Sequence, residues 1–267
     1  MKKIVAVFAS IDGGGGAGLL ADCRAVASAG CRPLAVVLGV SAQNLDNFAG
    51  LWQVPPGVVG AQFSALSGAP VAAVKIGMLA DNAAAVGRCI KQIRQTHPAP
   101  VVWDPVVAAT APLAGAAKQQ KPNAIQNARR HIARHVFVAT PNRAELSALT
   151  GGKTISEGLR VLFADGVRYV LITGIAAGKG KLRHCLYSAD SDVCAPIWDV
   201  VCERRRGVFH GSGCLFSSLL AAHLARGECL TQAAGRANAK TLAAIDKAQN
   251  TKPDITGWGR RQKILPQ

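Results

Sequence analysis

The sequence predicts an α/β fold in which a mostly parallel sheet carries helices on both faces. Short apolar runs rich in β-branched residues alternate along the 267-residue chain with segments whose apolar residues recur at helical spacing. Repeated strand-helix-strand units of this kind form parallel sheets between two helical layers. A hydrophobic content of 49% supplies a sizeable core and excludes a disordered chain. No linker-like segment divides the sequence, so we expect one domain over residues 1–267.

The first half of the chain is expected to begin with a buried strand over 3–9, a short apolar run that stops at a turn. The glycine-rich loop IDGGGGAG follows, and the apolar spacing of 17–30 then predicts a helix that ends at Gly30. The same criteria assign the remaining elements of this half, namely strands at 33–43, 70–79 and 99–107 and helices at 56–68 and 81–95.

The second half begins with residues 108–122, a stretch rich in Gln, Ala and Lys that predicts a loop. Helical spacing and apolar runs then predict helices at 123–135, 143–151 and 156–166 and strands at 136–142 and 167–174. Residues 181–188 and 193–200 are expected to form a hairpin of edge strands. Two long helices, 212–226 and about 230–248, complete the fold before an irregular basic tail from about residue 249.

The net charge of +16 allows three interpretations: a nucleic-acid partner, anionic small-molecule ligands, or a general solubility bias. A nucleic-acid-binding surface normally clusters its basic residues and interleaves aromatic ones. Here aromatic residues make up only 5%, and Lys and Arg are spread apart from short runs at 128–135, 203–206 and 259–263. We therefore expect no specific nucleic-acid partner.

The eight cysteines show neither a CxxC pair nor the Cys/His spacing of a metal site. Several lie in apolar stretches, as buried small hydrophobic residues do. The apolar run at the N-terminus is too short for a signal peptide, and no run approaches the roughly 18 apolar residues of a membrane helix. These features predict a cytoplasmic protein with free thiols and no membrane partner.

Ligands of parallel α/β sheets bind beyond the carboxyl ends of the strands. The glycine loop after Asp12 lies there, and its glycines let backbone approach a ligand closely, although a flexible turn is the simpler alternative. The loop matches neither the dinucleotide fingerprint nor the P-loop. The other strand-end residues are Gln43, Asn44, Lys75 to Met78, Asp104, Asn142 and Thr173.

The segment HGSGC (210–214) is the stronger signal, because small residues at a helix start leave N–H groups and a positive dipole end for an anion. An ordinary helix start with Ser212 as N-cap is the alternative. Cys214 would lie in the first turn, where the pKa of a thiol falls. The alternative for Cys214 is a buried apolar role.

Acidic and amide side chains accompany this segment. Asp104 and Glu145 near an anion site suggest Mg²⁺ held through water, although Glu145 could equally complement a helix dipole. The amide of Gln43 can bind the nitrogen and amino edge of a heterocycle, or it is a turn residue. Met78 is more often a core residue on general grounds.

These motifs, in this order, resemble the hydroxymethylpyrimidine/phosphomethylpyrimidine kinases of thiamine biosynthesis, which belong to the ribokinase-like superfamily. The resemblance spans about residues 4–226 and is carried by D…GGAGLLAD (12–22), AQN (42–44), VKIGML (74–79), DPVV (104–107), TPNRAEL (140–146) and HGSGC (210–214). It implies a ribokinase-like three-layer α/β/α sandwich. It also implies transfer of the γ-phosphoryl group of ATP to 4-amino-5-hydroxymethyl-2-methylpyrimidine and then to its monophosphate, with Mg²⁺.

The resemblance also implies roles for particular residues. Gly211, Ser212 and Gly213 match the anion nest, and Cys214 matches the cysteine that this family carries where ribokinase relatives have an aspartate base. Asp12, Ala17, Gln43, Met78 and Val106 match the pyrimidine pocket, and Asn142 and Thr173 the nucleotide site. Asp104 and Glu145 match the positions that hold Mg²⁺ and its waters. Homodimers are common in the family.

The sequence departs from the family pattern at several places. Gly14 and Ser10 replace a serine and a glycine of the glycine loop, and the segment after DPVV lacks the usual Ser-Gly step. Thr173, in TGIAAGKG (173–180), stands where a phosphate-contacting lysine is usual, so Lys179 or an arginine of 204–206 is the candidate replacement. A pyridoxal kinase of the same fold and a catalytically weak pyrimidine-binding sensor therefore remain as alternatives.

Overall fold

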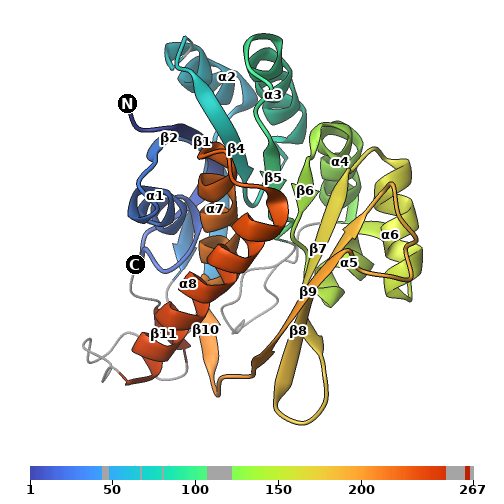
Figure 1. The fold of residues 1–267 in the computed structure, drawn as a ribbon. Helices are drawn as coiled ribbons and strands as arrows, with labels where there is room; N and C mark the ends of the chain where they lie inside the picture. The colour runs from blue at the N-terminus through green and yellow to red at the C-terminus, as the bar shows by residue number, and fades with distance from the viewer. Residues whose placement is uncertain (44–47, 67, 80, 107–121, 251–261, 265–267) are drawn as a thin grey trace.

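A computed structural model describes residues 1–43, 48–66, 68–79, 81–106, 122–250 and 262–264. Its central feature is a nine-stranded sheet in the order β3-β2-β1-β4-β5-β6-β7-β8-β9 (Figure 1). The five pairings from β2 through β1, β4, β5 and β6 to β7 are parallel, whereas β3, β8 and β9 join antiparallel at the two edges. The predicted mostly parallel sheet is confirmed.

The strands of this sheet are short in the middle and long at the edges. Their bounds are β1 (Ile4–Asp12), β2 (Arg32–Gln43), β3 (Phe48–Gln53), β4 (Val71–Ile76), β5 (Val101–Trp103), β6 (Val138–Ala139), β7 (Tyr169–Ala176), β8 (Lys181–Ser188) and β9 (Trp198–Glu203). A second, parallel pair joins β10 (Val208–His210) to β11 (Gln262–Ile264).

Two hydrophobic cores lie on opposite faces of the sheet, because side chains alternate along each strand. In β1, Ala6 and Phe8 face one core, and Val5, Val7 and Ala9 face the other. The first core is covered by α2 (Pro56–Ala65), α3 (Ala83–Thr96), α4 (Pro122–Ile132), the short 3₁₀ helix η1 (Ala133–His135), α5 (Arg143–Thr150) and α6 (Ile155–Ala164). The second is covered by α1 (Gly18–Ser28), α7 (Ser212–Ala225) and α8 (Leu230–Asn250). The three-layer sandwich is thus confirmed.

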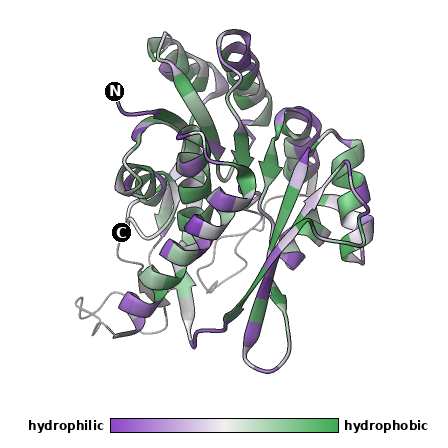
Figure 2. Cartoon of the chain, in the orientation of Figure 1, coloured by the Kyte–Doolittle hydropathy of each residue, from purple (hydrophilic) through white to green (hydrophobic). Residues whose placement is uncertain are grey.

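Residues 212–225 of α7 form the most buried helix, since every position from Leu215 to Ala225 is buried. It packs between α1 and α8 and against β4 and β5 (Figure 1). In Figure 2 the central strands are mainly green, whereas α8, which covers α7, alternates between hydrophobic and hydrophilic segments. A helix that is apolar on all sides must lie inside the molecule, and this burial fixes the N-terminus of α7 rigidly.

Three local expectations differ from the structure. Strand β3 was not predicted; it is an edge strand with exposed Trp52, so its pattern lacks a continuous apolar run. The last strand of the hairpin spans Trp198–Glu203 rather than 193–200, because residues 189–197 form the turn. Within the tail expected to be irregular, 262–264 form β11, while 251–261 lie outside the described residues.

The predicted loop 108–122 also lies outside the described residues, except for Pro122, which begins α4. None of the helices in the described ranges combines the length and the apolar character that crossing a membrane requires.

Candidate active site

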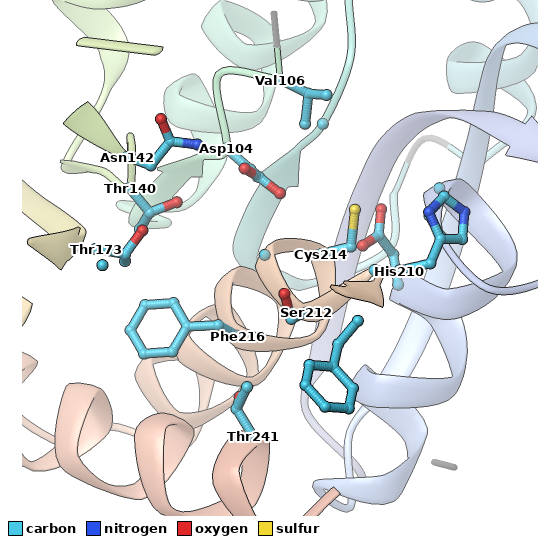
Figure 3. Close-up of a pocket in the computed structure, with 18 of the residues that line it drawn as sticks. Asp104, Val106, Thr140, Asn142, Thr173, His210, Ser212, Cys214, Phe216 and Thr241 are labelled. Atoms are coloured by element: carbon cyan, nitrogen blue, oxygen red, sulfur yellow. The ribbon is translucent and has the colours of Figure 1, made fainter. Parts of the chain in front are cut away.

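One cavity of about 530 Å³ opens at the carboxyl ends of the parallel strands, where α7 begins. Every described residue that the sequence suggested for the site lines this cavity: Asp12, Ala17, Gln43, Met78, Asp104, Val106, Asn142, Glu145, Thr173, Gly211, Ser212, Gly213 and Cys214. Asn44 lies outside the described residues. In the view of Figure 3, Asp104, Cys214 and His210 are seen along the upper side of the cavity, and Phe216 and Thr241 below.

The turn from β10 into α7 forms the anion nest. Gly211 is the N-cap residue and has a φ of 82°, a left-handed conformation that favours glycine. Ser212 is the first helical residue, so the alternative in which its side chain caps the helix is wrong; in the described part of the chain no side chain caps α7. The N–H groups of a first helical turn have no acceptor within the helix. Those of Ser212, Gly213 and Cys214 therefore stay available to an anion in the cavity.

Asp12 anchors the glycine loop against this nest. Its Oδ1 accepts a hydrogen bond from the N–H of Gly14 (2.9 Å), and its Oδ2 accepts one from the N–H of Ala17 (3.0 Å). His210 Nε2 lies 3.0 Å from the same Oδ2, and the side chain of Gln43 also hydrogen-bonds the carboxylate. Burial opposes the charged form, but these bonds, led by that of His210, hold the pKa of Asp12 below its ordinary value. Asp12 is thus an ionised hub at the cavity wall.

A fully buried ion-pair network lies beneath the nest. Lys75 Nζ is 2.7 Å from Asp22 Oδ2 and 3.7 Å from Asp104 Oδ2. Ser218 Oγ donates to Asp22 Oδ1 (2.9 Å), and Ser217 Oγ donates to Asp104 Oδ2 (3.0 Å). Burial disfavours the charge of Lys75, but the negative charge of Asp22 outweighs it and raises the pKa of the ammonium group. Asp104 therefore presents one oxygen to fixed protein partners and keeps Oδ1 on the side of Gly213.

Of this network, only Lys75 and Asp104 were noted from the sequence, as residues at strand ends. Asp22 and the two serines lie inside the buried faces of α1 and α7, where sequence spacing gives no sign of their partners. The available signal was the lysine within the apolar run VAAVKIGML, because a lysine is almost never fully buried without a paired acid.

Cys214 lies in the first turn of α7 and is partly exposed in the cavity. Loss of water around the sulfur raises its pKa above the ordinary value, and the carboxylates of Asp22 and Asp104 add to this. Lys75 and the N–H of Gly18 act in the opposite direction but do not compensate. The expectation that the helix start lowers the pKa of this thiol is therefore wrong. In the ligand-free protein Cys214 is a neutral thiol at pH 7.

Asn142 and Glu145 form a capping box at the start of α5. Asn142 Oδ1 accepts from the N–H of Glu145 (2.9 Å), and Glu145 Oε2 accepts from the N–H of Asn142 (2.8 Å). Burial and the nearby charge of Asp104 raise the pKa of Glu145 to about 8. The helix-start role of Glu145 is thus observed, and a second carboxylate faces it across the cavity.

These two carboxylates were the predicted Mg²⁺ site. No cluster of three or more His, Cys, Asp or Glu side chains that could hold a metal occurs among the described residues. Mg²⁺ nevertheless suits a site with one or two carboxylates, because phosphate oxygens and water complete its shell. The mutual repulsion that raises the pKa of Glu145 beside Asp104 shows that a cation fits between them.

The opposite wall of the cavity contains ring and basic side chains. The ring of His184 stacks on Phe216, with centroids 6.1 Å apart and an interplanar angle of 12°. Burial lowers the pKa of His184, so its ring is neutral at pH 7. Thr241 also lines this wall (Figure 3). Flat apolar surfaces of this kind suit a nucleotide base.

Thr173, which stands where the resemblance would place a lysine, lies beside Asn142 at the end of β7. Among the candidate basic replacements in the described ranges, Arg204 and Arg205 line the cavity, whereas Lys179 and Arg206 do not. Arg205 is held by Asp246 through two contacts of 2.6 and 2.9 Å. Arg204 is exposed and takes part in no ion pair with the described residues.

Comparison with known proteins identifies related chains. The family model described as phosphomethylpyrimidine kinase matches residues 12–257. The thiamine biosynthesis bifunctional protein ThiED of Geobacter sulfurreducens is 32% identical over 92% of this chain, which spans only 49% of that longer protein. The hydroxymethylpyrimidine/phosphomethylpyrimidine kinase of Streptomyces coelicolor is 30% identical, with 91% of this chain and 88% of the relative covered.

The architecture also matches solved structures. The ADP complex of Bacillus subtilis pyridoxal kinase superposes with a TM-score of 0.77 at 26% identity, covering 98% of this chain and 97% of that one. This structure has the ribokinase-like fold, as the three layers and the sheet order described above do.

Proposed function

The chain belongs to the phosphomethylpyrimidine kinase family, and from this membership we propose that it transfers the γ-phosphoryl group of ATP to 4-amino-5-hydroxymethyl-2-methylpyrimidine and to the corresponding monophosphate. The observation that carries the proposal is the joint position of the nest at Gly211–Gly213, the thiol of Cys214 and the carboxylate of Asp104 in one cavity. An anion site beside a cation site is what transfer of a phosphoryl group requires.

Phosphoryl transfer depends mainly on positioning and on stabilisation of charge. The N–H groups at the start of α7 point to the place where the charge of the moving phosphoryl group would develop, and the burial of α7 holds them there without reorganisation. The wall with His184 and Phe216 suits the nucleotide base, and Arg204 supplies positive charge beside it. The substrate ring then occupies the side with Gln43, Met78 and Val106.

The carboxylates of Asp104 and Glu145 would hold Mg²⁺, directly or through water. When bound, Mg²⁺ neutralises charge on the donor phosphates. Lys75 and Ser217 fix one oxygen of Asp104, so the orientation of this carboxylate does not depend on the ion.

Cys214 acts as a weak hydrogen-bond partner of the hydroxymethyl group rather than as a preformed thiolate. The raised pKa of the thiol supports this assignment. Because the transition state of phosphoryl transfer is loose, little proton removal is needed before the new bond forms. Cys214 therefore orients the attacking oxygen toward the phosphorus atom, and the hydroxyl proton leaves as the ester is formed.

The test is incubation of the purified protein with ATP, Mg²⁺ and each pyrimidine, with ADP release and phosphorylated product as readouts. Both pyrimidines are expected to be phosphorylated. Absence of product at high enzyme concentration contradicts the proposal. If the pyrimidine then raised the melting temperature without turnover, a binding or sensor role would replace the kinase role.

A pyridoxal kinase activity is the second candidate, because the B. subtilis pyridoxal kinase covers nearly the whole chain. Side-by-side values of kcat/KM for the hydroxymethylpyrimidine and for pyridoxal decide between them. We expect the pyrimidine to be the better substrate. A cytoplasmic location and a homodimer remain predictions from the sequence.

A further inference from the structure

The carboxylate of Asp12 is held by donors from two separate parts of the fold. Gly14 and Ala17 donate from the glycine loop, and His210 approaches from β10. The side chain of Asp12 is almost fully buried, with 3% exposed. A carboxylate clamped by three groups on both oxygens cannot rotate to suit a neighbour, so its neighbours must adapt to it.

Gln43 is the neighbour that must adapt. Its side chain hydrogen-bonds Asp12 and also lines the cavity. An ionised carboxylate only accepts hydrogen bonds, so the amide must turn its NH₂ group, not its carbonyl oxygen, toward Asp12. The chemistry of the two groups alone fixes this orientation, whichever way an amide is drawn.

One N–H of Gln43 is thereby used, and the carbonyl oxygen and the second N–H remain. These two groups can face the cavity, where they form an acceptor beside a donor. A ring edge that carries an amino group next to an unprotonated ring nitrogen is complementary to this pair. A ring with an oxo group next to a ring N–H presents the reverse pattern. To bind the oxo ring, Gln43 would have to flip and bring its carbonyl oxygen against the Asp12 carboxylate.

We infer that Asp12, fixed by His210 and the glycine loop, is a positioning residue that sets the orientation of the Gln43 amide and thereby selects amino-substituted over oxo-substituted heterocycles. The inference deepens the proposed function and rests on it, since it assumes that the ring lies against Gln43. Asp12 acts through Gln43 and need not touch the ligand.

The test uses two ligands that cannot be phosphorylated, because they lack the hydroxymethyl group: 4-amino-2,5-dimethylpyrimidine and 2,5-dimethylpyrimidin-4-one. Titration calorimetry of the intact protein measures both dissociation constants. We expect the amino compound to bind at least about tenfold more tightly, because the oxo compound leaves buried polar groups unpaired. In Asp12→Asn this ratio should fall toward one, since the new amide can donate to a flipped Gln43.

Asp81→Asn is the matched control. Gln53 Nε2 donates to Asp81 Oδ2 at 2.7 Å, which makes the same pair of residue types on the exposed surface, away from the cavity. This variant loses the same charge, and its amino-to-oxo ratio should equal that of the parent protein.

The possible outcomes separate the inference from the proposed function. Equal binding of the two compounds to the parent protein overturns the inference and leaves the kinase proposal intact. A full ratio retained in a folded Asp12→Asn protein also overturns it. Absence of binding of both compounds contradicts the substrate class and the inference with it. If circular dichroism shows that Asp12→Asn does not fold, Gln43→Leu replaces it; the ratio should then vanish, and its persistence overturns the inference.

Discussion

The Cα atom of Gly211 lies directly against the carbonyl oxygen of Gly16, so that a methyl group at position 211 would overlap this oxygen. Gly211 begins the anion nest, and Gly16 belongs to the glycine loop beside the predicted substrate pocket. Asp12 and His210 bridge the same two segments. The two glycine-rich motifs of the sequence thus form one structural unit, in which the place of the substrate is tied to the place of the phosphoryl group.

We predict that Gly211→Ala lowers both stability and turnover. A left-handed φ costs an alanine about 1 kcal/mol, and the overlap with Gly16 adds about 1–3 kcal/mol or displaces the loop. Gly227→Ala is the control, because Gly227 has a φ of 88° with open space around it. Urea denaturation should show the smaller loss for Gly227→Ala, with unchanged kcat. Equal losses in the two variants would contradict the close packing of the two motifs.

For Cys214 we predict that serine and alanine differ. Because the pKa of the thiol is raised, its role is a hydrogen bond to the attacking hydroxyl group, which a serine also provides. Cys214→Ser should keep kcat within about threefold, whereas Cys214→Ala should lose about tenfold or more, with little change in KM for the pyrimidine. Steady-state kinetics between pH 6 and 9 provide the measurement. An inactive serine variant would show that a thiolate is needed.

The position of the site could be predicted from the sequence because parallel strands end on one edge of a sheet. Asp12, Gln43, Asp104, Asn142 and Thr173 are up to 161 residues apart, yet all follow strands and all line the cavity. Their place needed only the order of the elements, which apolar spacing reveals. Their chemical roles beyond this stay predictions.

Features that depend on the partners of a side chain could not be predicted in this way. The first turn of α7 suggested a lowered pKa for Cys214, but burial and two carboxylates that come from α1 and the end of β5 reverse the direction. Likewise, the run 204–206 offers three arginines, and only the fold shows which of them face the cavity. Local sequence carries no information on such long-range contacts.

We predict that Arg204 contributes to nucleotide binding. It lines the cavity and is not held in an ion pair by the described residues, unlike Arg205. Arg204→Ala should raise KM for ATP about threefold to tenfold with little change in kcat, because an exposed charge supplies binding that is uniform through the reaction. The effect should shrink with added salt. Arg206→Ala and Lys179→Ala serve as controls and should leave KM for ATP unchanged; an equal rise in Lys179→Ala would assign the charge there.

The last prediction concerns the pH dependence of stability. The pKa of Glu145 is about 8 in the folded protein and near 4.5 when unfolded, because of burial and the charge of Asp104. Between these values the folded state binds the proton and the unfolded state does not, so this group makes stability fall as the pH rises. Glu145→Gln keeps a partner for the capping box but removes this loss. In chelator-containing buffer, its free energy of unfolding relative to the parent should rise by roughly 1–2 kcal/mol from pH 5 to pH 8, a figure reduced for partial exposure.

Glu157 offers a matched control, since it completes the other capping box, at the start of α6, but is exposed. Hydrogen bonds from Thr154 and Lys153 lower the pKa of Glu157, so its contribution to stability is lost only as the pH falls toward and below its unfolded pKa. Glu157→Gln should therefore run parallel to the parent between pH 5 and 8. If Glu145→Gln also ran parallel to the parent over this range, Glu145 would not be a protonated neighbour of Asp104, and its assignment to the cation site would lose its main support.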